Sequence, residues 1–345
     1  MSKGIDIAVL GATGAVGQAM LRVLAERQFP VGRIFALASQ RSAGQTVEFN
    51  GTALSVEAVD DFDWSQVQVG LFSAGGSVSA QWAPIAAAAG VIVIDNTSHF
   101  RYDADVPLVV PEVNPDAVEG FRARNIIANP NCSTIQMLVA LKPLHDAAEI
   151  TRINVSTYQA VSGTGKEAID ELEAQNRADV AGNTPQAEVY PKIIAGNVLP
   201  HIDVFMANGY TKEEMKMVWE TQKILGSDGI RVNPTCVRVP VVFGHSEAVH
   251  IETRRKLTAD DARALLAAAP GVQVLDERAD GGYPTARSEA AGNDWTWVGR
   301  IREDISHENG LNLWVVSDNV RKGAASNSVQ IAELLVAKNR LQPRG

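Results

Sequence analysis

Apolar and polar positions in the first part of the chain follow two alternating patterns. Nearly continuous apolar runs at residues 5–10, 33–39, 67–74 and 91–95 are typical of strands buried on both faces of a parallel sheet. The segments AVGQAMLRVLAER and SVSAQWAPIAAAA, which follow the first and third runs, have helical character instead. This alternation predicts a Rossmann-like, doubly wound α/β sheet in residues 1–131.

The pattern changes after residue 131. Longer strand candidates appear in RINVSTYQAV, CVRVPVVFGHSEAVHIETRR, TWVGRIRED and LNLWVVSDNV. Helical segments lie between them, including GKEAIDELEAQNRADVA, TKEEMKMVWETQKILG and LTADDARALLAAAP, the last with Thr258 as its N-cap. We therefore expect an α+β domain with a mixed or antiparallel sheet in residues 132–317.

The chain ends in an amphipathic segment, residues 323–341. Its predicted apolar face carries Val329, Leu334, Leu335 and Val336. A terminal amphipathic helix needs a surface to cover, so we expect this helix to return to the first domain, with residues 318–345 completing it.

Composition narrows the function classes. The chain has 345 residues, a length typical of two domains, with 46% hydrophobic and 21% charged residues. Its net charge of −9 argues against nucleic acid or an anionic membrane as the main partner. Two cysteines are too few for a disulfide scaffold, and we see neither a signal peptide nor an apolar run of about 18 residues. These features predict a cytoplasmic protein.

A glycine-rich stretch, GATGAVG, lies between the first predicted strand and the first predicted helix. Its spacing is G-x-x-G-x-x-G rather than the commoner G-x-G-x-x-G, and the motif alone is compatible with a simple turn. The strand before it and the helix after it favour a dinucleotide site, because helix N-termini bind pyrophosphate through backbone N–H groups. The predicted contacts are Gly11, Thr13, Gly14, Ala15 and Val16.

The segment after the second strand, LASQRSAGQ, bears on the choice of cofactor. A ribose-binding carboxylate is expected there for NAD, but the residues are Ser39, Arg41 and Ser42. Hydroxyl groups and a guanidinium suit a 2′-phosphate, so we expect NADP, although a plain polar loop is the alternative. In FSAGG, Ser73 and Gly75 end a later strand where a cofactor could lie against the backbone; a tight turn is the other interpretation.

Cys132 stands at the start of a predicted helix, in NPNCSTIQM. The positive end of a helix lowers a thiol pKa and favours the nucleophilic thiolate. The turn at residues 129–131 supplies amide donors for a developing oxyanion. Considered alone, Cys132 could equally be an inert packing residue or a catalytic one. Cys236, in contrast, is predicted to be a core residue of a strand.

A cysteine nucleophile combined with a nicotinamide cofactor indicates aldehyde chemistry. A thiol and an aldehyde form a thiohemiacetal, and hydride transfer converts it to a thioester that phosphate or water cleaves. Such chemistry needs an acid or base. Of six histidines, His245 follows a strand and a glycine, where a side chain can reach a cleft; a surface-turn histidine is the alternative.

Nine sequence blocks occur in order along the chain: GATGAVG, SQRSAG, VIVIDNTSHFR, PLVVPEVNP, NPNCSTIQM, YQAVSGTGK, EEMKMVWETQKIL, CVRVPVVFGHSE and GAASNSVQIAE. With these blocks the chain resembles aspartate-semialdehyde dehydrogenase across essentially its full length. The resemblance implies NADP-dependent conversion of 4-phospho-L-aspartate to L-aspartate 4-semialdehyde, with no metal. It also implies a homodimer built through the second domain and a place in lysine, threonine, methionine, isoleucine and diaminopimelate biosynthesis.

The resemblance also implies a role for each matched residue. Cys132 is the expected nucleophile, His245 the general acid/base, and Gln159 the group that orients the acyl carbon. The expected substrate contacts are Arg238 for the α-carboxylate, Glu213 (or the adjacent Glu214) as the acidic contact, and Lys216, Arg101 and Asn131 for phosphate. The expected cofactor contacts near the nicotinamide are Ser162, Gly163 and Asn327.

Two other functions are compatible with the sequence. One is a related acyl-phosphate reductase, such as N-acetyl-glutamyl-phosphate reductase, acting on a longer or N-acylated acid. The other is a non-catalytic NADP-binding sensor. The intact set of Cys132, Gln159, Arg238 and His245 argues against the sensor.

Overall fold

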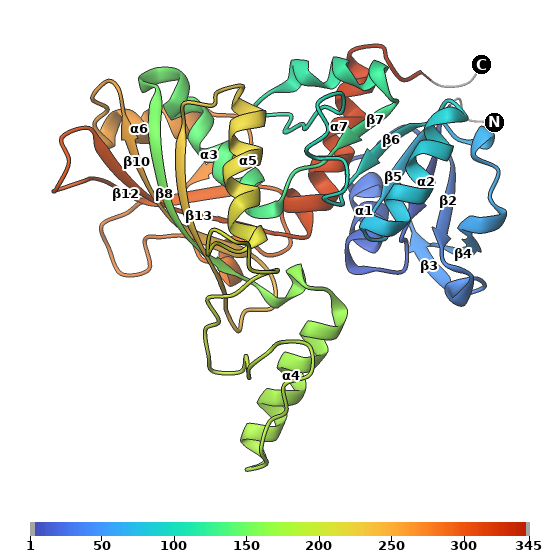
Figure 1. Cartoon of the computed structure of the whole chain (residues 1–345), viewed down its shortest axis with the longest axis horizontal. Coiled ribbons are helices and arrows are strands. Elements are labelled where there is room, and N and C mark those ends of the chain that lie inside the picture. Colours follow the sequence, from blue (N-terminus) through green and yellow to red (C-terminus); the bar gives the residue numbers. More distant parts are fainter. Residues whose placement is uncertain (1–3, 343–345) are drawn as a thin grey trace. The chain divides into compact units, whose positions relative to one another are not determined.

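The computed structural model describes residues 4–342, arranged in two compact units (Figure 1). The first unit holds residues 4–131 and 324–342, and the second holds residues 132–323. The extreme ends of the predicted first domain, residues 1–3 and 343–345, lie outside the described residues. No helix within residues 4–342 is both long and apolar enough to cross a membrane.

The first unit is built on a seven-stranded sheet with the order β3-β4-β2-β1-β5-β6-β7. All neighbouring strands are parallel except the edge pair β3–β4. The chain proceeds from β1 to β2 on one side and to β5 on the other, so the topological switch point lies between β1 and β5. The strands are β1 Ile5–Leu10, β2 Val31–Ala38, β3 Thr46–Phe49, β4 Thr52–Ala58, β5 Val69–Phe72, β6 Ile92–Asp95 and β7 Ile126–Ala128.

Three helices accompany this sheet: α1 Ala15–Glu26, α2 Gly76–Ala88 and α7 Ser326–Ala337. Helix α7 packs on α1 and β6. Arg27 of α1 and Glu333 of α7 form a two-pronged ion pair, with Nε–Oε1 2.8 Å and Nη2–Oε2 2.7 Å. These contacts hold the last helix of the chain within the first unit.

The second unit contains a six-stranded mixed sheet with the order β11-β12-β13-β10-β8-β9. The pairs β11–β12 and β8–β9 are parallel, and the other neighbours are antiparallel. The strands are β8 Ile150–Gln159, β9 Arg231–Arg238, β10 His245–Thr253, β11 Val272–Val274, β12 Thr296–Glu303 and β13 Gly310–Ser317.

Four helices belong to the second unit: α3 Cys132–Ala148, α4 Lys166–Val180, α5 Lys212–Leu225 and α6 Ala259–Ala268. Helix α3 packs on β10 and β13, α5 on β9, and α6 on β11 and β12. Helix α4 instead extends away from the sheet (Figure 1). Both α5 and α6 start with a capping box, from Thr211 and Thr258, which confirms the predicted N-cap at Thr258.

The sequence pattern predicted the α/β and α+β classes correctly but was wrong in three details. The long candidate CVRVPVVFGHSEAVHIETRR is two strands, because residues 239–244 form the loop between β9 and β10. The last helix begins at Ser326, after a π-helical turn at Arg321–Ala325. Its fully buried face is Val329, Ile331, Ala332 and Leu335, whereas Leu334 and Val336 are only half-buried.

Candidate active site

Cys132 is the first residue of α3, and its side chain is half-buried. The first N–H groups of a helix have no partner within the helix, and they create a positive potential that favours a thiolate. Gly323 lies directly against this cysteine: a Cβ added to Gly323 would be 2.7 Å from the Cβ of Cys132. A side chain at position 323 would therefore clash with Cys132 unless one of the two residues moved.

Three predicted side chains form one register row across the second sheet. Gln159 of β8 pairs with Arg238 of β9. In the β8–β10 ladder Ser246 pairs with Tyr158, so the next step places His245 opposite Gln159. All three side chains are at most 5% exposed. The sheet register therefore brings together residues that are up to 86 positions apart, from Gln159 to His245.

The imidazole of His245 is fully buried and has a defined tautomer. The backbone N–H of Ala160 donates to Nδ1 at 3.0 Å, so a neutral ring carries its proton on Nε2. Burial, and then the positive charge of Arg238, lower the pKa of His245 to about 3. Within residues 4–342 Nε2 has no hydrogen-bond partner, which leaves it available to a bound molecule.

Arg238 is fixed from two sides. Its Nη1 donates to the carbonyl of Ala160 at 2.7 Å, and its guanidinium lies 5.9 Å from the ring centroid of Tyr190. Its Nε has no hydrogen-bond partner in the described part of the chain. A Cβ on Gly163 would come within 3.1 Å of Nη1 and 3.4 Å of the His245 ring, so a larger residue at this position would press on the Arg238 guanidinium.

An acidic and a basic residue from α5 complete this cluster. Glu213 accepts a hydrogen bond from Gln159 Nε2 (3.3 Å) and forms an ion pair with Lys216 Nζ (2.9 Å). Lys216 also contacts Asp203 at 2.8 Å. The pKa of Lys216 is raised, because these two carboxylates together outweigh the desolvation that opposes the charge.

The structure separates the roles of the two neighbouring glutamates. Glu214 caps α5 with Thr211, and its Oε1 accepts the backbone N–H of Cys236 at 3.0 Å. Glu214 is therefore occupied by structural hydrogen bonds. Glu213 is the acid that faces Gln159, so the geometry favours Glu213 for the acidic contact.

Ser162 lies in a short turn after β8, where its hydroxyl bonds the Asn319 side chain (Nδ2–Oγ 2.9 Å). Asn319 Oδ1 also accepts the backbone N–H of Gly244 at 2.9 Å. Asn319 thus ties the loop before His245 to the turn that carries Ser162 and Gly163. Sequence reasoning missed Asn319, Ala160, Tyr190 and Asp203, because their roles depend on contacts that the sequence does not reveal.

The glycine loop of the first unit lies at the switch point between β1 and β5. Gly11 has φ +90°, and a Cβ there would be 2.7 Å from the carbonyl oxygen of Ser73 at the end of β5. A Cβ on Gly17 would be 2.1 Å from the Gly11 carbonyl oxygen. Gly14 supplies no side-chain cap for α1, so the helix presents uncapped backbone amides, as a pyrophosphate site requires. Thr13, Ala15 and Val16 are half-buried around this helix start.

The other predicted cofactor contacts lie at the ends of β2 and β5. Ser39 and Arg41 are exposed in a short 3₁₀ turn, with Ser42 half-buried, and Ser42 N–H donates to Ser39 O at 2.9 Å. Ser73 is half-buried, and Gly75 is the N-cap of α2 with φ +97°. Two glycine-bearing helix starts therefore follow the adjacent strands β1 and β5.

Asn327, Asn131 and Arg101 belong to the first unit. Asn327 Nδ2 bonds Asn129 Oδ1 (2.7 Å) and Val109 O (3.0 Å), so it supports the turn that precedes Cys132. Asn131 is buried, and Arg101 Nη2 donates to the Asn96 carbonyl at 2.7 Å. The predicted phosphate contacts are thus divided between units, and their joint action stays a prediction.

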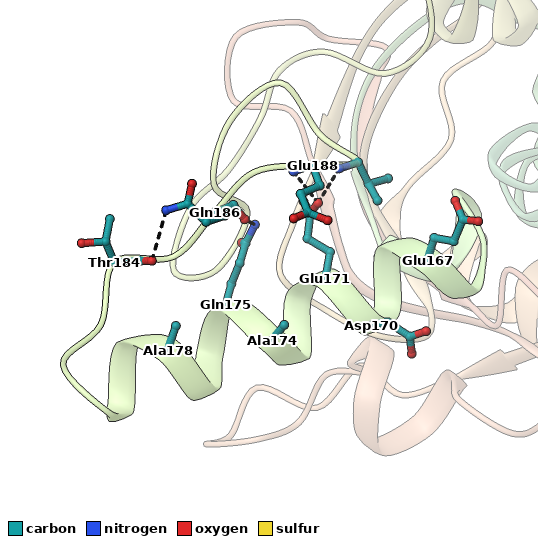
Figure 2. Close-up of a pocket in the computed structure, with 10 residues that line it drawn as sticks. Glu167, Asp170, Glu171, Ala174, Gln175, Ala178, Thr184, Gln186 and Glu188 are labelled. Carbon is teal, nitrogen blue, oxygen red and sulfur yellow. Dashed lines mark hydrogen bonds between the residues drawn. The ribbon is translucent and has the colours of Figure 1, made fainter.

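A pocket lies elsewhere, along α4. It has a volume of about 680 Å³ and is lined by α4 and the returning segment around Thr184–Val189. Figure 2 shows Glu171 accepting the backbone N–H of Glu188, which folds that segment back on the helix. None of the predicted site residues lines this pocket. Among residues 4–342, no cluster of three or more His, Cys, Asp or Glu side chains could hold a metal ion.

Comparisons with known proteins agree over nearly the whole chain. Residues 6–121 match the family model "Semialdehyde dehydrogenase, NAD binding domain", and residues 141–322 match "Semialdehyde dehydrogenase, dimerisation domain". The chain is 64% identical over 336 residues to an aspartate-semialdehyde dehydrogenase from Shewanella violacea, covering 97% of this chain and 99% of the relative. An aspartate-semialdehyde dehydrogenase 2 from Vibrio cholerae is 61% identical over 336 residues, with coverage of 97% and 99%.

Solved structures give the same result. The crystal structure of aspartate semialdehyde dehydrogenase II from Vibrio cholerae, complexed with ASA, has a TM-score of 0.95 at 60% identity and covers 97% of this chain and 98% of that chain. The enzyme from Candida albicans, solved with NADP, has a TM-score of 0.76 at 26% identity, with coverage of 97% and 99%.

Proposed function

Because the chain belongs to the aspartate-semialdehyde dehydrogenase family, we propose that Cys132, His245, Gln159 and Arg238 perform that family's reaction here. The reaction is the reductive dephosphorylation of 4-phospho-L-aspartate to L-aspartate 4-semialdehyde in amino-acid biosynthesis. The observation that carries the residue assignment is the buried row of His245, Gln159 and Arg238 in the sheet that α3 covers. A relative of 60% identity was crystallised with ASA, which supports the same substrate for this chain.

The nucleophile is the thiolate of Cys132. It attacks the acyl carbon, the bond from that carbon to the phosphate oxygen breaks, and a thioester to the protein forms. Phosphate leaves with the electron pair of the broken bond and takes up a proton from solvent. Lys216, Arg101 and Asn131 bind that phosphate, since cationic and amide groups suit its charge.

The bound nicotinamide cofactor supplies the hydride. The residues of this chain prepare the thioester carbon to receive it: Gln159 orients the acyl group, and His245 presents its Nε2–H toward the oxygen that becomes negative. Because the neutral ring already carries its proton on Nε2, it stabilises this oxyanion without any prior rearrangement. When the carbonyl re-forms, the carbon–sulfur bond breaks and the Cys132 thiolate is regenerated.

Substrate recognition follows from the charges of a zwitterionic acid. Arg238, held by Ala160 O and Tyr190, offers a planar guanidinium for a two-pronged contact with the α-carboxylate. Glu213 contacts the α-amine. A longer or N-acylated acid would lack the free amine, so Glu213 favours aspartate semialdehyde over such substrates.

The test is phosphate-dependent reduction of NADP with L-aspartate semialdehyde, together with mass spectrometry of the reacting protein. Wild type is expected to turn over and to show an aspartyl adduct on Cys132. The Cys132→Ala variant is expected to lose turnover but to bind NADP, whereas the matched Cys236→Ala variant keeps turnover. Turnover by Cys132→Ala, or an adduct that is never found on this thiol, would contradict the covalent route.

We further propose that the cofactor is NADP rather than NAD. The support is the set Ser39, Arg41 and Ser42 at the end of β2, with Arg41 exposed and able to reach a 2′-phosphate. An Arg41→Asp variant is expected to shift the NADP/NAD ratio of kcat/KM toward NAD. The charge-matched control is Arg287→Asp, an exposed residue of the second unit. An unchanged ratio in Arg41→Asp would mean that other groups recognise the phosphate.

The chain also matches a dimerisation domain, and we propose a homodimer formed through the open face of the second sheet. That face carries the Tyr158–Trp314 ring contact and the hydrogen bond between His250 Nε2 and Asp304 Oδ2 at 2.7 Å. Sedimentation equilibrium is expected to give twice the chain mass, and Trp314→Arg to give monomers. A monomeric wild type at micromolar concentration would rule this interface out.

A further inference from the structure

A second polar row lies directly behind the row of His245, Gln159 and Arg238. In this row Glu247 of β10 pairs with Thr157 of β8, and Thr157 pairs with Cys236 of β9. Each of these residues is two positions from a member of the first row, so its side chain points to the same face of the sheet. All three are completely buried.

Glu247 is the unexpected member of this row. Its neighbour across the ladder in β13 is Val315, and the next inward residue of its own strand is Val249. No partner within residues 4–342 meets hydrogen-bond geometry with either of its carboxyl oxygens. Burial raises the pKa of Glu247 well above its usual value, and the side chain of Gln136 opposes that shift. An ionised carboxylate in such a place is strongly disfavoured, so the neutral acid is the stable form.

Gln136 lies between Glu247 and two residues of the proposed site, Cys132 and His245. It lies four residues after Cys132 in α3, which places the two side chains on the same face of that helix. Its Nε2 donates to the backbone carbonyl of His245 at 3.4 Å. Its Oε1 is buried and has no hydrogen-bond partner in the described chain. A protonated Glu247 carries the O–H donor that this oxygen needs.

We propose that Glu247 and Gln136 form a neutral positioning pair, which holds His245 in register with the helix that begins at Cys132. Glu247 O–H donates to Gln136 Oε1, and Gln136 in turn donates to the His245 carbonyl. Neither residue touches substrate. The pair acts through His245, so this inference rests on the proposed function of that residue.

Other ionisable groups on this side of the sheet must be considered. They are His245 on the same strand, Cys236 and Arg238 on β9, and the buried Glu213, Glu214 and Glu220 of α5. On helix α3 the ionisable side chain nearest in sequence to Gln136 is Cys132, four residues before it, whereas Lys142, His145 and Asp146 lie at least six residues further on. Burial, and then the negative charge of Glu213, raise the pKa of the Cys236 thiol well above its usual value, which keeps that thiol neutral as well.

Three variants of the pair separate positioning from packing. Glu247→Gln keeps the shape and an N–H donor, whereas Glu247→Met and Gln136→Met keep approximate volume but lose the hydrogen bonds. We expect Glu247→Gln to retain kcat within about twofold, and both Met variants to lose roughly tenfold to hundredfold in kcat with unchanged KM for phosphate and NADP. The pH profile of kcat is expected to move in the Met variants and to be retained in Glu247→Gln. Thr221→Val, which removes a buried hydroxyl without a partner in the described residues, is the control and is expected to keep kcat.

Infrared spectroscopy tests the proton directly and does not depend on turnover. The difference spectrum of wild type minus Glu247→Gln at pH 8 is expected to contain the carbonyl band of a protonated carboxylic acid. Absence of that band, or a Glu247→Gln variant as impaired as Glu247→Met, would overturn the neutral pair. Met variants with normal kcat and pH profile but lower Tm would reduce both residues to packing. If wild type lacked dehydrogenase activity, the proposed function would fail while the band still reported on Glu247.

Discussion

Gly323 limits the space available to the proposed nucleophile, so Gly323→Ala tests how strictly Cys132 must be placed. A Cβ at position 323 would be 2.7 Å from the Cys132 Cβ and 3.2 Å from its Cα. Ordinary contact between such atoms begins at 3.4 Å, so the two groups must separate by at least 3.4 − 2.7 = 0.7 Å. The atoms that clash are a Cβ and a Cα, close to the backbone, so rotation of the cysteine side chain cannot relieve the clash.

Two effects on stability oppose each other in this variant. Overpacking costs about 1–3 kcal/mol. Gly323 does not have a left-handed backbone, so alanine is allowed there and stabilises by about 0.4–1 kcal/mol through the unfolded chain. The net loss of stability is therefore about 0–2.6 kcal/mol, below the 5–15 kcal/mol typical of a folded domain, so the folded protein remains available for kinetic study. A displacement near 1 Å costs on the order of 100-fold in rate, so we expect kcat to fall roughly tenfold to hundredfold.

The assay is kcat for phosphate-dependent NADP reduction, together with the pH dependence of Cys132 alkylation by iodoacetamide. The matched control is Gly229→Ala, where the new Cβ would meet only Ser227 Oγ at 3.8 Å. The control is expected to behave like wild type. If Gly323→Ala lowered Tm but kept wild-type kcat and alkylation, the claim that Cys132 must be held in place would be refuted.

Three further predictions concern the buried row. Arg238→Lys loses the two-pronged contact and is expected to raise KM for aspartate semialdehyde roughly tenfold to hundredfold. The KM for NADP is expected to stay unchanged and is the internal control. If the variant and wild type had equal KM values for aspartate semialdehyde, Arg238 would not bind the carboxylate. Gly163→Ala is expected to raise the same KM severalfold, because its Cβ would press on Arg238 Nη1 at 3.1 Å; an unaltered KM would show that the guanidinium can move. The pKa of His245 is about 3 when folded, so the unfolded chain binds its proton first and wild type loses about 1.4 kcal/mol of stability per pH unit from pH 6.5 down toward pH 3. The substitution His245→Asn is therefore expected to lower the free energy of unfolding in urea by less at pH 5 than at pH 7. An equal loss relative to wild type at the two pH values would contradict a buried, neutral ring.

The fold class could be predicted because the buried strands of the first unit are short and apolar. Residues 5–10 are β1 with the predicted bounds, and the family resemblance is confirmed by relatives of 60–64% identity. Strand β4 was missed because only alternate residues in its second half, such as Val56 and Ala58, are buried. Strand β7, only three residues long, gave too short a signal. Strands of this kind are fixed by their neighbours rather than by their own pattern.

The sequence predicted some features of the candidate site but not others. Motifs identified Cys132, His245 and Arg238, but the sequence does not contain the register that joins them. Glu213 and Glu214 could not be distinguished from spacing, because that choice depends on which of them caps α5. Asn319 follows a strand like many loop residues, and only its bonds to Ser162 and Gly244 show its importance. The roles assigned to residues and domains stay predictions until variants are measured.

The second sheet shows a relation between depth and polarity that a sequence can reveal once the register is known. Of the inward positions of β10, the two nearest its first residue are polar, His245 and Glu247, whereas Val249, further into the sheet, is apolar. A strand selected only for packing would have apolar residues at all three positions, because alternation alone predicts that they are buried. Burying a histidine and a carboxyl instead lowers stability. Such residues are retained where they serve function, because low-dielectric surroundings produce the largest pKa shifts. Polar residues at inward positions recur at the ends of the adjacent strands β8, β9 and β10. This mismatch therefore indicates the site without reference to any motif.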